Sequence, residues 1–474
     1  MSGKLGFWTL VAIVFGMMVG SGLYNIPQNL ASGSGIGAVA LAWLITAAGM
    51  LLLVATFKIL ADRRPDLNAG IYQYAQDGYG DFTGFNIAWG YWLCTAFANV
   101  AYAVMLNDSF GAFFPVFLGH GWPTLVFGTV LIWAMFLIVA GGLRTAKFLN
   151  NLLAVVKVAA IVLIICLLVI NIRLGIFEIN WISQLCDGGS LGTQVRNTML
   201  VTLWCFIGIE GAVMMSARAK RPSDVGKAGV VGFVIAWLLY VLVSMLCFGV
   251  MTRAELAGLQ DPSVAYVLRA IGGEWCYYFV IISVIVSLLG GWLAWTLVCA
   301  QVPYEAATVK IFPTRFLRLN RYGMPAFGLF VSSVVMECFL LLVMMADDVY
   351  MAALTITGMM VLPAYLFSGM YLWKESYHVA DLGLKGRKDK WRCRVTGISC
   401  TLYCVWMIYA GGLELFTFTS LFYIAGIGFY VIARKEKHGV KTYKFTYTDR
   451  VVSILLGAGA ILSVIFLALG RRPF

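Results

Sequence analysis

Two segments of the sequence interrupt apolar runs with glycines and polar residues, and both could bind charged groups. They read GMMVGSGLYNIP at 16–27 and LWCFIGIEGAVMM at 203–215. Glycine lets a helix unwind, because its cost inside a helix is only roughly 1 kcal/mol relative to alanine. An unwound helix exposes N–H groups that bind anions at the start of its second half, and carbonyl groups that bind cations at the end of its first half.

These backbone groups suit the two charged ends of an amino acid. The N–H groups of Ser21 and Gly22 would receive an α-carboxylate, and the carbonyls at 204–207 would receive an α-ammonium. The alternative is that the glycines only permit close packing of helices, as in small-xxx-small motifs. Two such segments in corresponding positions of the chain favour a binding site.

Polar side chains within the apolar runs are further candidates. Ionisable groups at membrane depth are costly and indicate function by default. Glu210 could carry a proton or sense the charge of a substrate, or it could be a buried hydrogen-bonding link between helices. Lys157 could connect its helix to the first glycine segment, or extend its ammonium to an interface. Tyr91 and Asn99 lie eight residues apart on one helix, and therefore on similar faces.

Two tryptophans lie beside glycines and could hold a cationic or planar side chain. Trp204 adjoins the second glycine segment, and Trp292 follows Gly290 and Gly291. A desolvated cation over an indole face gains about 2 kcal/mol. Most of the 15 tryptophans are expected at the membrane interfaces, and Trp295 is considered for such a position.

The composition places these residues in a membrane protein. Apolar residues make up 61% of the 474 residues and charged residues 12%, with a mean hydropathy of +0.87. A soluble domain carries about 25% charged residues, so this chain has too little charge to cover a soluble particle. Segments long and apolar enough to span a bilayer are predicted at 7–30, 37–61, 83–106, 123–142, 148–170, 196–217, 228–251, 275–304, 325–345, 349–373, 395–411, 415–433 and 451–469.

The predicted fold is an all-α polytopic membrane protein with 12–13 spans. The glycine segments lie in spans one and six, the first helices of two five-helix halves, which indicates an inverted 5+5 repeat with broken helices 1 and 6. The first repeat would cover residues 1–171 and the second 172–374. Residues 375–474 would add C-terminal spans and basic loops.

The distribution of basic residues predicts the orientation. With the N-terminus in the cytoplasm, 27 of the 34 lysines and arginines fall in cytoplasmic loops and 6 on the opposite side. This clustering also argues against nucleic-acid binding as the reason for the net charge of +12. The basic loops at 374–394 and 434–450 are expected to contact anionic lipid headgroups.

An enzyme is a poor interpretation of this chain, and no cofactor or metal is expected. The three histidines fall in separate loops, and no metalloprotease, serine-hydrolase or P-loop motif is present. The eleven cysteines contain no CxxC pair and lie mostly in apolar runs, which is typical of buried, inert thiols.

Four long runs resemble one transporter superfamily. GSGLYNIPQNLA, GFNIAWGYWLCTAFANVAY, NTMLVTLWCFIGIEGAVMMSARAK and SLLGGWLAWTLVCAQVPYEAA are similar to the amino acid–polyamine–organocation superfamily. Within it, the chain resembles the basic amino acid/polyamine antiporters, and most of all their arginine/ornithine branch. The resemblance covers about residues 5–435 and extends toward the last span.

The resemblance implies a site and a mode of transport. Ser21 and Gly22, with Gly20 in the same break, would hold the substrate carboxylate, and the carbonyls of Met18, Trp204 and Ile207 its ammonium. Asn99 would reach the substrate, Trp204 and Trp292 would stack on its side chain, and Tyr91 and Glu210 would take part in gating. Lys157 matches the lysine that replaces sodium in sodium-independent members. Members of the superfamily are often dimeric, so a homodimer is considered.

The expected function is exchange of arginine for ornithine or agmatine across a bacterial inner membrane. One departure bears on the substrate: span ten has Gly358 and Met359 where the arginine/ornithine branch carries a Ser–Glu pair. Histidine/histamine and lysine/cadaverine exchange therefore stay open. A proton-coupled symporter using Glu210 or Lys157 is the alternative from another class. A channel is disfavoured, because no ring of charges or carbonyls is evident.

Overall fold

The computed structural model describes residues 6–20, 22–67, 69–118, 121–183, 189–214, 219–345, 349–378, 386–438 and 445–469. Within these residues, ten helices are long and apolar enough to cross a membrane. They are α3 (Ile36–Arg63), α5 (Asp81–Gly111), α6 (Trp122–Ala140), α11 (Pro222–Cys247), α14 (Glu274–Thr308), α15 (Ala326–Val343), α16 (Val349–Glu375), α17 (Gly386–Gly411), α18 (Leu413–His438) and α19 (Tyr447–Ala468).

Two further spans are bent pairs of helices. Helix α1 (Phe7–Met18) and α2 (Gly22–Gly33) meet at 44°, and α7 (Leu143–Ile170) is followed at 90° by α8 (Leu174–Ser183). Counting each pair as one span gives up to 12 candidate spans in the described part of the chain. The chain is therefore an all-helical polytopic membrane protein with broken helices, as the composition predicts.

The predicted sixth span is divided into shorter pieces. Helix α9 (Leu191–Trp204) ends in the second glycine segment, and α10 (Gly211–Met214) follows after a turn. Neither piece is long enough to cross a bilayer alone. Residues 215–218, which would complete the span, lie outside the described residues.

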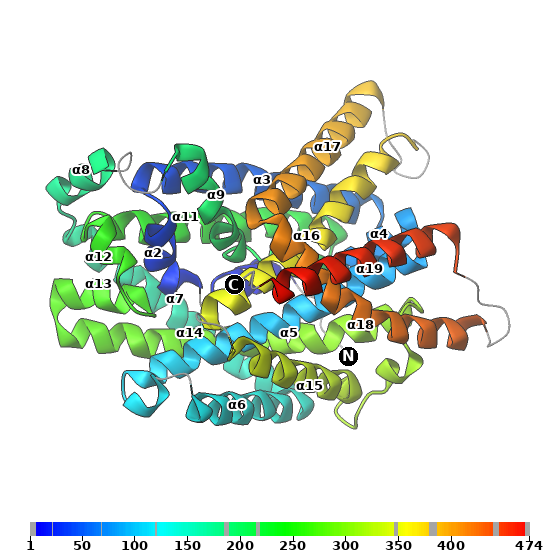
Figure 1. The fold of residues 1–474 in the computed structure, drawn as a ribbon, viewed down its shortest axis with the longest axis horizontal. Helices are drawn as coiled ribbons and strands as arrows, with labels where there is room; N and C mark the ends of the chain where they lie inside the picture. Colours follow the sequence, from blue (N-terminus) through cyan, green and yellow to red (C-terminus); the bar gives the residue numbers. More distant parts are fainter. Residues whose placement is uncertain are drawn as a thin grey trace.

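Helix α5 forms the centre of the bundle, and the helices at the periphery expose apolar side chains. The spanning part of α5 is buried throughout, and the helix packs against α14 and α16 (Figure 1). In contrast, α19 exposes a series of large apolar residues that includes Ile454, Leu455 and Ile461. A surface of this kind suits a hydrocarbon solvent, because lipid tails leave such side chains without contact to water.

Four short helices lie between the predicted spans, in segments for which the sequence analysis predicts no helix. They are α4 (Ile71–Tyr79), α8, α12 (Arg253–Ala257) and α13 (Ser263–Gly272). Helix α12 begins with a capping box between Thr252 and Glu255. The backbone N–H and the hydroxyl of Thr252 stabilise the Glu255 carboxylate and so lower its pKa.

Hydrogen bonds tie α8 and α12 to the second half of the first span. Asn180 Nδ2 of α8 donates to the carbonyls of Phe248 (2.6 Å) and Met251 (2.9 Å), and Asn180 Oδ1 accepts from Arg253 N (2.7 Å). Arg253 Nε then donates to Ala31 O of α2 at 3.0 Å. The three short segments α2, α8 and α12 are thus linked at one end of the bundle. The division into two repeats and the orientation in the membrane stay predictions.

Candidate functional site

The two helix breaks face each other in the interior of the protein. Helix α1 ends at Met18 and α2 begins at Gly22, whereas α9 ends at Trp204 and α10 begins at Gly211. A Cβ on Gly22 would lie 3.1 Å from Trp204 Cδ1, and one on Gly208 would lie 2.8 Å from Met17 Cβ. The glycines of each break therefore provide the space that the opposite break occupies.

Gly208 provides the first test of this packing. Its φ is +110°, and an added Cβ would collide with both the side chain and the backbone of Met17. Backbone strain of this kind costs on the order of 1–3 kcal/mol, and the collision adds to it. We expect Gly208→Ala to lower the thermal stability of the purified protein and its transport rate. Gly457→Ala in α19, where an added Cβ meets nothing within 4 Å, is the control, and equal stability of the two variants would contradict the close approach of the breaks.

A small cavity lies between the breaks. Its walls come from both sides of the first break, from the end of α9 and the turn that follows it, and from the facing surfaces of α5 and α14. It is lined by Met17, Met18, Gly20, Gly22, Ala98, Tyr102, Trp204, Ile207 and Trp295. The cavity volume is about 10 Å³, which is space for about one water molecule. An amino acid, the substrate expected from the sequence, does not fit this volume.

Five of the residues predicted for the substrate site line this cavity. They are Met18, Gly20, Gly22, Trp204 and Ile207. Ser21, which was expected to bind the carboxylate, lies outside the described residues. The Met18 carbonyl, one of the expected ammonium acceptors, accepts a hydrogen bond of 2.9 Å from the Tyr240 hydroxyl.

Asn99 and Trp292 lie behind the cavity wall rather than in it. The hydroxyl of Thr296 is 3.1 Å from Asn99 Oδ1 and 2.8 Å from the Trp292 carbonyl. Both predicted residues are fully buried, and Asn99 Nδ2 donates to Thr95 O within its own helix. Trp292 Nε1 has no hydrogen-bond partner within the described part of the chain.

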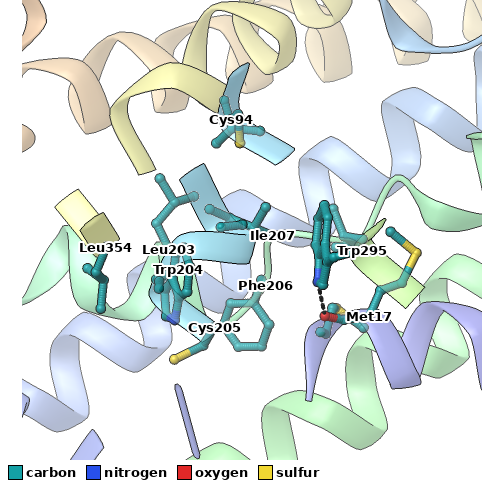
Figure 2. Packing of buried hydrophobic residues seen from close by; sticks show 14 of the residues in the cluster. Met17, Cys94, Leu203, Trp204, Cys205, Phe206, Ile207, Trp295 and Leu354 are labelled. Atoms are coloured by element: carbon teal, nitrogen blue, oxygen red, sulfur yellow. Dashed lines mark hydrogen bonds between the residues drawn. The ribbon is translucent and has the colours of Figure 1, made fainter. Parts of the chain in front are cut away.

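Trp295 is in the cavity wall, although an interfacial position was considered for it. Its side chain is buried, and its Nε1 donates to Met17 O at 3.2 Å (Figure 2). This hydrogen bond ties α14 to the end of α1. Trp292 and Trp295 lie three residues apart on similar faces of α14, so their spacing alone does not distinguish them.

Glu210 connects the second break to two other helices. Its carboxylate accepts from the Tyr91 hydroxyl of α5 (2.6 Å) and the Tyr365 hydroxyl of α16 (2.7 Å). The backbone N–H of Gly208 donates to it at 3.1 Å. The predicted pair of Tyr91 and Glu210 is thus brought together. Tyr365 was missed, because an apolar span with a tyrosine gives no signal of a partner 155 residues away.

Lys157 bonds to the first break. Its Nζ donates to Val19 O, just after α1, and lies 3.4 Å from Gly16 O in the last turn of α1, where helix carbonyls lack intrahelical donors. The side chain is only 2% exposed, so the ammonium does not extend to an interface. Charge-assisted hydrogen bonds to backbone carbonyls are stronger than neutral ones, and Lys157 therefore stabilises the end of α1 and the start of the break that follows it.

A metal-binding arrangement is not evident in the part of the chain that the structure describes. No three His, Cys, Asp or Glu side chains lie close enough there to hold a metal ion. The cavity itself is lined by the glycines of the first break, two methionines, Ala98, Tyr102, Ile207 and two indole rings.

Comparisons with known proteins give a family match and several relatives of this chain. Residues 5–432 match the family profile described as "Amino acid permease". The chain is 40% identical to an "Arginine/agmatine antiporter" of Chlamydia abortus over 474 residues, which cover 98% of this chain and 97% of that protein. A protein of the same name in Chlamydia pneumoniae is 38% identical, with 99% and 98% covered. A "Putative amino-acid transporter" of Clostridium perfringens is 37% identical, with 98% of each chain covered.

Proposed function

The chain belongs to the amino acid permease family, and on that premise we propose that it exchanges arginine for agmatine across the membrane by alternating access. The observation that carries the proposal is the cavity between the two helix breaks, lined by Gly22, Trp204 and Ile207. The N-terminal end of α2 favours an anion, and the carbonyls at the end of α9 favour a cation. Membership of a transporter family means that the protein is not an enzyme.

Agmatine is the better supported counter-substrate. The two chlamydial relatives carry arginine and agmatine in their names, whereas ornithine, the other expected product, has no support from them. Agmatine is arginine without the α-carboxylate, so the two molecules share the guanidinium and the aliphatic chain. The same indole faces would therefore hold both, and only the break at 19–22 would distinguish them.

Alternating access explains how a closed cavity transports a substrate. The cavity holds about one water, so binding requires α2 or the turn before α10 to move away from its opposite break. Helices that are already interrupted can move their two halves separately. We further propose that the protein lies in a bacterial inner membrane with a cytoplasmic N-terminus, on the basis of the basic loops.

Counterflow in proteoliposomes tests the exchange. Vesicles loaded with arginine receive labelled arginine, agmatine, ornithine, histidine or lysine outside, and empty vesicles serve as the control. We expect uptake of arginine and agmatine only into loaded vesicles. Agmatine carries one more positive charge than arginine at neutral pH, so we expect their exchange to respond to an imposed membrane potential. Uptake into empty vesicles driven by a pH gradient would overturn the antiporter in favour of a proton-coupled symporter.

Trp292 is proposed to stack on the substrate side chain once the cavity opens. A desolvated cation–π contact is worth about 2 kcal/mol, so Trp292→Leu should raise the KM for arginine and agmatine about 30-fold. Trp275→Leu is the matched control, because Trp275 is exposed at the start of the same helix. An unchanged KM in the Trp292 variant would remove the stacking role.

Two further proposals concern substrate and assembly. Residues 358 and 359 of α16 are Gly and Met, so no acid is available there for the guanidinium, and exchange of histidine or lysine with its amine is the outcome to look for if arginine is not transported. A homodimer is proposed, and the molecular mass of the detergent-solubilised protein, corrected for bound detergent, tests it.

A further inference from the structure

Asn25 is a buried amide one helical turn from Gly22 in the cavity wall. Its side chain is 0% exposed, and neither Nδ2 nor Oδ1 has a partner among the residues that the structure describes. A buried amide normally has its hydrogen bonds made, because leaving them unmade costs free energy. An orphaned amide beside a transport site therefore requires a functional account.

The position of Asn25 on α2 places it on a seam between α2 and α9. Gly22, Asn25, Asn29 and Gly33 are spaced three or four residues apart and share one face of α2. The two ends of this face lie against α9: a Cβ on Gly22 would be 3.1 Å from Trp204 Cδ1, and one on Gly33 would be 3.3 Å from Asn197 Cβ.

The seam extends from the cavity to the protein surface. Trp204 lines the cavity, whereas Asn197, seven residues earlier on α9, is exposed. Near this outer end, Ser34 Oγ donates to Gln194 O at 2.5 Å, and Gly35 N donates to Gln194 Oε1 at 2.9 Å. The seam is thus closed at both ends in this structure. Asn25 lies one helical turn outward from the cavity.

We propose that the α2–α9 seam is an access path and that Asn25 forms an outer binding position on it for the guanidinium group. This inference rests on the proposed arginine/agmatine exchange and adds a second position to it. When α2 and α9 separate, Asn25 Oδ1 accepts a hydrogen bond from a guanidinium N–H, a donor that arginine and agmatine share. The closed seam leaves the amide without that partner.

The chemistry of the seam suits a transient position. The sequence of α2, GLYNIPQNLASG, contains no acidic residue, so the guanidinium meets a neutral acceptor rather than a carboxylate. A neutral amide binds a cation through a charge-assisted hydrogen bond but without an ion pair. A substrate held in this way is released readily into the cavity, as a transport path requires.

Asn25→Leu tests the outer position, because its effect should depend on the side of the membrane from which the substrate enters. In right-side-out spheroplasts, kcat/KM for entry of arginine and of agmatine should fall about tenfold, the loss expected for one hydrogen bond to a charged group. In inverted vesicles, kcat/KM from the opposite face should stay at the wild-type value. Asn86→Leu is the control, because Asn86 of α5 also has a buried, unpartnered Oδ1 within the described residues. Equal losses of kcat/KM from the two faces of the membrane, or no loss from either, would overturn the outer binding position.

Labelling of Asn25→Cys gives a second readout. In spheroplasts, a membrane-impermeant thiosulfonate should modify this cysteine beyond the level of the wild-type protein, and agmatine should protect it. Absence of labelling, or labelling that agmatine does not reduce, would overturn the access path. Wild-type exchange is measured in the same cells. If the wild type exchanges neither arginine nor agmatine, the proposed function fails and the guanidinium position with it; if it does, a failure of the Asn25 variants counts against the outer position alone.

Discussion

Lys157→Met is expected to reduce exchange about 100-fold while the protein remains folded. The ammonium bonds to Val19 O and Gly16 O in a buried position, and methionine matches the length of the chain without providing a donor. Each buried carbonyl left without a partner costs about 1–3 kcal/mol. We expect the loss of both contacts to raise the barrier between the states that interconvert during transport. A barrier higher by about 2.7 kcal/mol lowers the rate about 100-fold.

The control for Lys157 is a lysine outside the bundle. Lys388→Met, in the exposed first turn of α17, removes one positive charge without affecting a break. Arginine counterflow and the elution profile of both purified variants are compared. A wild-type rate in Lys157→Met would mean that the ammonium has no part in transport. We also expect wild-type exchange to be the same in sodium and choline buffers, because Lys157 already supplies a cation at the first break.

The spans and the breaks could be predicted because their signals are local. About twenty apolar residues in a row predict a spanning helix, and the segments GMMVGSGLYNIP and LWCFIGIEGAVMM fall where α1 and α9 end. Helices α4, α8, α12 and α13 were not predicted, because they lack this signal of about twenty apolar residues. Each has ten residues or fewer, too short to span a membrane, and tertiary contacts such as those of Asn180 hold α8 in place.

The partners of the site residues could not be predicted, because they come from distant parts of the chain. Glu210 was a candidate from its own position, but the sequence contains no mark that connects it to Tyr365. Likewise, which of Trp292 and Trp295 lines the closed cavity depends on the rotation of α14 about its axis. Trp295 lines it, and its indole N–H donates to Met17 O. That the Asn25 amide has no partner among the described residues is a property of packing alone.

We expect the second large loss of transport rate from a substitution at Glu210, because its carboxylate accepts three hydrogen bonds. Tyr91 and Tyr365 donate from α5 and α16, and Gly208 N donates from the break itself. The acceptor capacity of a carboxylate allows this arrangement. In Glu210→Gln one oxygen becomes an NH₂ group, which donates only. At least one of the three donors then loses its acceptor, and the turn before α10 is less firmly held to α5 and α16.

We expect Glu210→Gln to slow arginine counterflow between about 10- and 100-fold, since hydrogen bonds to charged groups contribute about 1.5–3 kcal/mol each. The pH dependence of the rate shows whether Glu210 acts by exchanging a proton or only by holding α5, α16 and the break together. Glutamine does not gain or lose a proton, so any part of the wild-type pH profile that comes from Glu210 should disappear. Tyr365→Phe removes one donor but keeps the carboxylate, and it should slow exchange less and retain the wild-type profile.

The matched control for Glu210→Gln is the same substitution at Glu337. This carboxylate lies on α15, where it accepts from Thr129 Oγ1 of α6 at 3.0 Å, away from both breaks. If Glu337→Gln leaves the rate and its pH profile as in the wild type while Glu210→Gln alters both, proton exchange at the second break is part of the transport cycle. If Glu210→Gln slows exchange but keeps the wild-type profile, the carboxylate only holds α5, α16 and the break together, and Tyr91→Phe and Tyr365→Phe should then slow exchange to a similar extent.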